Sequence, residues 1–107
     1  MRDLTELNKL EAYLKANGVD YFREDSNNTY SAEMWTQMID VLGAHAEPMD
    51  HHQIVVLKDG RRSWDVICHR GSYGCDQGLL EGMGDIFEDV EGWLTATDVI
   101  RRIEDDN

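Results

Sequence analysis

The chain has 107 residues and is strongly acidic, with 22 Asp and Glu against ten Lys and Arg and a formal net charge of -12. This charge repels phosphate backbones and anionic lipid headgroups, so direct nucleic-acid binding and electrostatic attachment to membranes are excluded from the expected functions. Apolar residues make up 41% of the chain, too many for a disordered protein, and the length suits one folded domain over residues 1–107.

The start of the sequence, MRDLTE, lacks the apolar run of a signal peptide, and no later stretch is long and apolar enough to span a bilayer. We therefore expect a cytoplasmic protein without a membrane span. In that reducing compartment Cys68 and Cys75 are expected to be free thiols.

Leucines at helical spacing predict the first element, a helix over residues 4–17. Its apolar face consists of Leu4, Leu7, Leu10 and Leu14. Asp3 can cap the first turn with Glu6 reaching back to it, and Gly18 can supply the left-handed residue that commonly follows a helix.

The next two segments are predicted to be a strand and a second helix. Residues 19–25 carry Tyr21 and Phe22 side by side, so we expect a strand whose aromatic side chains pack on the first helix. Ser31 can cap a helix over residues 31–42. The apolar residues of that helix share one face: Met34, Trp35, Met38, Ile39 and Leu42.

The strongest local signal is the Asp59–Gly60 pair between two apolar runs. A tight hairpin turn needs positive φ at both central residues, so this pair predicts a hairpin with strands 52–57 and 62–69. A two-residue turn pairs Val55 with Trp64, and we expect Trp64 in the core. Both faces of the hairpin are largely apolar, so helices or another strand should cover most of it.

Residues 76–87 are predicted to form a third, irregular helix that contains several glycines. Its helical face consists of Leu79, Leu80, Met83, Ile86 and Phe87. An acidic loop with Glu88, Asp89 and Glu91 should follow and end at Gly92.

Thr95 and Asp98 have the spacing of a capping box and predict a last helix over residues 96–104. The elements together predict an α+β domain. Its three-stranded antiparallel sheet, built around the central hairpin, packs against three to four helices.

Three segments of the second half resemble small uncharacterised proteins of gut Firmicutes and their prophages. These segments are residues 64–74 (WDVICHRGSYG), 78–81 (GLLE) and 92–96 (GWLTA), and residues 31–42 look like an insertion in the pattern. The resemblance implies an accessory protein of a phage or mobile element. Such proteins include small acidic inhibitors of host defence, among them anti-CRISPR proteins.

Charge and resemblance together favour a protein that binds rather than catalyses. Its negative surface is expected to imitate nucleic-acid charge and occupy a basic site on a host protein, for example a CRISPR effector nuclease or another nucleic-acid enzyme. Trp35 is a second candidate for an interface anchor beside Trp93. The expected partner contacts are Asp85, Glu88, Asp89, Glu91 and Trp93.

The alternatives are a small enzyme or metal-binding protein that uses a His and Cys cluster, and a homo-oligomeric structural module. The cluster consists of His51, His52, Cys68, His69 and Cys75. No Cys-x-x-Cys or His-x-x-x-His pair occurs, and strand alternation places His51 and Cys68 on the face opposite to His52. Neither a metal nor a cofactor is therefore predicted.

A nucleophilic site would combine Ser72 or Cys75 with His69 and Asp65, but no nucleophile elbow is present. We expect Asp65 to be held by an Arg of the hairpin or by His52.

The Gly-rich turn of residues 71–74 could present its backbone N–H groups to an anion. It lacks the Lys of a phosphate-binding loop, so we expect a tight strand-to-helix reversal instead.

Overall fold

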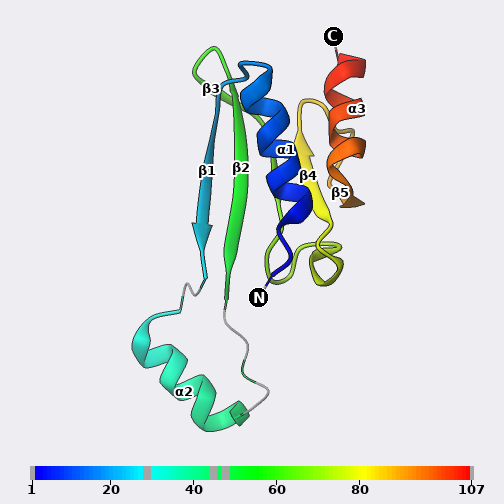
Figure 1. Cartoon of the computed structure of the whole chain (residues 1–107). Helices are drawn as coiled ribbons and strands as arrows, with labels where there is room; N and C mark the ends of the chain where they lie inside the picture. The colour runs from blue at the N-terminus through cyan, green and yellow to red at the C-terminus, as the bar shows by residue number, and fades with distance from the viewer. Residues whose placement is uncertain (1, 28–29, 44–45, 47–48, 107) are drawn as a thin grey trace.

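The computed structural model describes residues 2–27, 30–43, 46 and 49–106. Over these residues the chain forms a five-stranded antiparallel sheet and three α-helices (Figure 1). The α+β class is confirmed, but the sheet has two strands more than the three predicted. None of the helices in the described ranges has the length and apolar character needed to cross a bilayer.

Each strand of the sheet pairs with the next one along the chain. The strands are β1 (Tyr21–Ser26), β2 (His51–Lys58), β3 (Arg61–Ile67), β4 (Leu80–Gly84) and β5 (Glu91–Leu94). Two helices, α1 (Thr5–Ala16) and α3 (Ala96–Asp106), cover one face of the sheet (Figure 1). The remaining helix, α2 (Ala32–Leu42), lies beyond the end of the sheet in the connection between β1 and β2.

The hydrophobic core lies between the sheet and the α1–α3 layer. Leu7, Leu10 and Leu14 of α1 are fully buried, as their spacing predicts. Trp64 of β3 is buried as expected, and its ring meets the ring of Phe87 edge-on, with centroids 6.0 Å apart. The other core residues are Ile54, Val56, Val66, Cys68, Leu80, Leu94, Ala96 and Val99.

Three carboxylates accept backbone N–H groups at the starts of α1 and α3. The capping box is confirmed, because the Thr95 N–H donates to Asp98 at 2.9 Å and the Asp98 N–H donates to the Thr95 hydroxyl at 3.1 Å. Asp3 accepts from the Thr5 N–H at 3.0 Å. Glu6 does not reach back to Asp3 but accepts from the Ala96 N–H at 2.9 Å. Glu6 thus links the first turns of α1 and α3.

The hairpin turn is confirmed, with φ of 55° at Asp59 and 76° at Gly60. The predicted register of the hairpin is wrong. A β-bulge follows the Leu57–Arg62 pair, so Trp64 pairs with Val56 instead of Val55. The additional residue in β3 is Ser63. A one-residue slip moves later side chains of the strand to the other face of the sheet.

Residues 76–87 do not form the predicted helix. A single 3₁₀ turn, η2 (Cys75–Gln77), precedes β4, in which Leu80 and Gly82 are buried and Met83 is exposed. Gly82 lies under the Phe87 ring, where a Cβ atom would come within 2.4 Å of the nearest ring atom. Its lack of a side chain therefore permits close packing on a strand. The acidic loop is also shorter than predicted, since β5 begins at Glu91.

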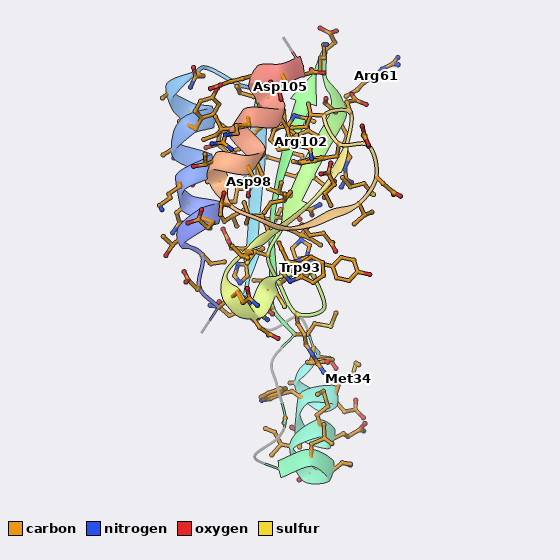
Figure 2. The ribbon with its side chains drawn as sticks, turned by 90° about the vertical axis from the view of Figure 1, so that its right-hand side faces the viewer. Met34, Arg61, Trp93, Asp98, Arg102 and Asp105 are labelled. Atoms are coloured by element: carbon orange, nitrogen blue, oxygen red, sulfur yellow. The ribbon has the colours of Figure 1, made fainter. Side chains whose placement is uncertain are left out.

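Only one face of the sheet is covered by helices. In Figure 2, α1 and α3 lie on one side of the sheet and no helix of the described ranges lies on the other, which we call the open face. Tyr21 turns toward α1 and its hydroxyl donates to Glu11 at 3.0 Å, whereas Phe22 is exposed. The expectation that both aromatic residues pack on the first helix was therefore wrong. No helix covers the open face of the hairpin, although Val55 and Asp65 on that face are buried.

Substitution of Gly82 by Ala should destabilise the fold by about 1–3 kcal/mol, because the new methyl group would overlap the Phe87 ring. Urea unfolding measures the difference. The control is Met83→Ala on the opposite, exposed side of the same strand, which should change the free energy of unfolding by less than about 0.5 kcal/mol. Equal stability of Gly82→Ala and wild type would contradict this packing.

Candidate functional site

The α2 helix contains no buried residue, although its sequence is apolar. It begins as predicted, with the Met34 N–H donating to the Ser31 hydroxyl at 3.1 Å. Met34, Ile39 and Leu42 are exposed on the predicted apolar face, and Val41 is 81% exposed. Figure 2 shows α2, with Met34, extending away from the body of the molecule. The helix thus presents an apolar surface that the described residues do not cover.

The apolar surface of α2 is continuous along the helix. A shallow hollow on it is lined by Met34, Gln37, Met38, Val41 and Leu42. Trp35 is half-buried and stacks on Tyr30, with ring centroids 6.2 Å apart. The Tyr30 hydroxyl accepts from the Arg70 guanidinium at 2.6 Å, which joins the start of the helix to the body.

The segment that contains α2 carries acidic side chains but no Lys or Arg. The sequence contains no Lys or Arg from residue 24 to residue 57. Glu33 and Asp40 are exposed on α2, and helical spacing puts them on the side opposite to Met38. The helix therefore has one apolar side and an opposite side that carries carboxylates.

A network of polar side chains, buried at His52 and Asp50, holds the two strands from which α2 extends. His52, at the start of β2, is buried with its Nδ1 atom 2.7 Å from Asp25 and its Nε2 atom 3.3 Å from Asp50. Asp50 accepts two hydrogen bonds from the Arg2 guanidinium, both at 2.9 Å. We call Arg2, Asp25, Asp50 and His52 the base network, because it joins the ends of β1 and β2 to the N-terminal segment.

Contacts within the base network shift the pKa values of Arg2, Asp25 and Asp50. Hydrogen bonding from Arg2 holds the pKa of Asp50 well below its usual range, and the same contact raises the pKa of Arg2. Burial raises the pKa of Asp25, but hydrogen bonds from His52 and Arg23 outweigh burial and leave that pKa below its ordinary value. Both carboxylates are therefore stabilised as anions in the folded protein.

The expected contact residues do not form one surface. Asp85, Glu88 and Asp89 are exposed in the connection between β4 and β5, and Asp85 accepts from the Ser63 hydroxyl at 2.9 Å. Glu91 forms an ion pair with Arg102 of α3. Trp93 is exposed on the open side of the sheet (Figure 2).

Exposed carboxylates occur along the whole length of the molecule. Examples from separate elements are Asp20, Asp40, Asp59, Asp76 and Asp105. The acidic surplus is thus spread over the surface rather than gathered on the expected contacts.

The His and Cys side chains separate onto the two faces of the sheet. His51 and His69 stack with centroids 4.9 Å apart, and burial together with the neighbouring His51 lowers the pKa of His69. Cys68 is fully buried on the core side, beside His52, so its predicted placement with His51 was wrong. The bulge at Ser63 causes this change of face. Over the described ranges, no three His, Cys, Asp or Glu side chains are grouped to hold a metal ion.

Ser72 and Asp65, two of the side chains considered for nucleophilic chemistry, are engaged in other contacts. The Ser72 hydroxyl donates to the His69 carbonyl at 2.7 Å and accepts from the His69 N–H at 3.0 Å. Asp65 accepts from Gln53 at 2.9 Å and forms the expected ion pair with a hairpin arginine, Arg62, also at 2.9 Å. Burial raises the pKa of the Cys68 thiol to about 11, which makes it a poor nucleophile.

The lowered pKa of Asp50 predicts a dependence of stability on pH. A carboxyl group with a lower pKa in the folded than in the unfolded chain stabilises the fold above its unfolded pKa of about 4, and this contribution is lost as the pH falls further. Asp50→Asn should therefore be less stable than wild type by about 1–3 kcal/mol at pH 7 and lose less stability on acidification.

Urea unfolding between pH 7 and pH 3 tests this prediction. The control is Asp76→Asn, because Asp76 is almost fully exposed and lies 3.7 Å from the same Arg2. Parallel pH curves for wild type and Asp50→Asn would contradict the assigned role of Asp50.

The described residues thus offer an apolar helix that nothing covers, a sheet face without a helix on it, and the base network. The sequence predicted the apolar face of α2 and the exposure of Trp93 but not the base network, in which Arg2 and Asp50 are far apart in the chain. Comparison with protein-family models, with curated proteins and with solved structures gives no match.

Proposed function

We propose that this protein acts by binding another protein, without catalysis, and that α2 is the helix by which it docks. The observation that carries the proposal is the apolar stripe of α2, in which no residue is buried. Exposed apolar patches of this kind are typical of protein interaction sites. An amphipathic helix that inserts its apolar side into a groove is a common mode of recognition.

The sequence of α2 defines the chemistry of the groove. Met34, Met38 and Leu42 follow one another at four-residue spacing and form the centre of the stripe. Methionine adapts its shape to apolar surfaces, so the groove is apolar. Glu33 and Asp40 lie on the opposite side of the helix without a neighbouring Lys or Arg, so the helix as a whole is acidic and the protein around the groove is expected to be basic.

A basic nucleic-acid-handling host protein meets this description, and a CRISPR effector nuclease is one example. The resemblance to phage and prophage proteins supports an inhibitory accessory role in the cytoplasm. In this proposal the net charge of -12 steers the protein to its partner, and the apolar stripe supplies most of the affinity. This differs from pure charge mimicry, which the spread of exposed carboxylates supports poorly.

Met38→Glu should weaken partner binding at least tenfold, because it puts a charge in the middle of the apolar stripe. Thr36→Glu is the matched control, since it adds the same charge to the polar side of the same helix and should stay within about threefold of wild type. Affinity capture from a bacterial host lysate identifies the retained protein, and titration of that purified protein gives the dissociation constants. The retained protein should be basic, and higher salt should weaken its binding.

Both variants should unfold at the same urea concentration as wild type, since α2 has no buried residue. Equal partner binding by Met38→Glu and wild type would refute the docking role of α2. Light scattering tests self-association: a wild-type dimer that Met38→Glu dissociates would mean that a second copy covers the helix, which would overturn the proposal in favour of a homo-oligomeric module.

A further inference from the structure

A pair of exposed aromatic side chains lies on the body of the protein, away from α2. Tyr73 and Trp93 stack with ring centroids 5.2 Å apart and planes inclined by 23°. Tyr73 is 54% exposed and Trp93 is 57% exposed. Figure 2 shows Trp93 projecting from the sheet on the side opposite to α3. The pair thus offers aromatic ring surface to solvent.

The backbone around these rings holds them in a fixed arrangement. Trp93 has a φ of 55°, a left-handed conformation that is uncommon for a large aromatic residue. Gly92 makes room for Tyr73, because a Cβ atom at Gly92 would come within 2.3 Å of the Tyr73 Cβ atom. Gly74, with a φ of 89°, would place a Cβ atom 3.1 Å from the Trp93 backbone. Strained backbone that presents exposed side chains is characteristic of functional sites.

The Gly-rich turn of residues 71–74 was expected to lead from a strand into a helix, and it does not. It leads through η2 into β4 rather than into a helix, and it brings Tyr73 against Trp93. The Tyr73 N–H donates to the Glu81 carboxylate at 3.2 Å, which puts an anionic group beside the aromatic pair. Glu81 precedes the exposed Met83 by two residues on β4, so it faces the open side of the sheet.

We propose that Tyr73, Trp93 and Glu81 form a second contact site that receives an arginine side chain of the protein partner. The proposal rests on the proposed function, because it assumes a basic partner. The faces of aromatic rings attract cations, and a planar guanidinium stacks on them while it donates to a carboxylate. A nucleobase also stacks on aromatic rings, but its phosphate would be repelled by a chain with a net charge of -12.

The probe is the peptide Ac-Gly-Arg-Gly-NH2, titrated into the full chain and followed by NMR. The indole N–H of Trp93 and the ring protons of Tyr73 should shift in a saturable way. The matched peptide with citrulline in place of arginine has nearly the same shape but no charge, and it should bind at least fivefold more weakly. Glu81→Gln should weaken binding of the arginine peptide about threefold or more.

Trp93→Gly removes the ring at a position whose φ suits glycine, so it should abolish the Tyr73 shifts without loss of stability. Met83→Ala, an exposed change on the same face, should leave them unaltered. Equal binding of the citrulline peptide, or shifts that persist in Trp93→Gly, would overturn the arginine site.

Met38→Glu separates this site from the function of α2. It should bind the arginine peptide as wild type does, even where it loses the captured partner. Absence of Trp93 shifts in the wild type would therefore refute the arginine site alone. Partner binding that Met38→Glu leaves intact would refute the docking helix alone.

Discussion

The packing of α1 and α3 on a single face of the sheet is the interaction on which the rest of the structure depends. Leu7, Leu10 and Leu14 are fully buried there, and each fully buried leucine contributes about 1.5–3 kcal/mol. Glu6 joins the two helices by accepting from the Ala96 N–H, which sets where α3 begins beside α1. Because both helices cover the same face, neither is left for the opposite face of the sheet or for α2. The uncovered surfaces follow from this arrangement.

Local signals in the sequence were sufficient for most helices and for the central hairpin. The Asp59–Gly60 turn, the Ser31 cap and the pairing of Thr95 with Asp98 each act within a few residues, and each occurs as expected. The error at residues 76–87 has a different origin. Apolar residues there fit a helical period, whereas Gly82 is required by the Phe87 ring that folds back over the strand. Such close approaches are set by tertiary packing, which overrides local propensity.

The candidate sites also combine features that have a local signal in the sequence with features that have none. The apolar face of α2 was evident from its spacing, but amphipathicity shows only that a surface tends to be covered and not which molecule covers it. Trp93 was expected at an interface, whereas its partner Tyr73 lies twenty residues earlier and was assigned only to a turn. The contact between Arg2 and Asp50 spans 48 residues and has no local signal. The bulge at Ser63, which places Cys68 on the same face of the sheet as His52, also has no recognisable pattern in the sequence.

Ser26 and His51 are cross-strand partners at the ends of β1 and β2. The segment between them, which contains α2, therefore leaves the sheet and returns to it at neighbouring positions. For the body of the protein this segment is equivalent to a long hairpin loop, and the entropy of closing a loop rises only slowly with its length. Evolution can thus lengthen, shorten or replace the helix while the same sheet and core persist. Under the proposed docking role of α2, one scaffold of this kind changes its target by exchanging a single connection.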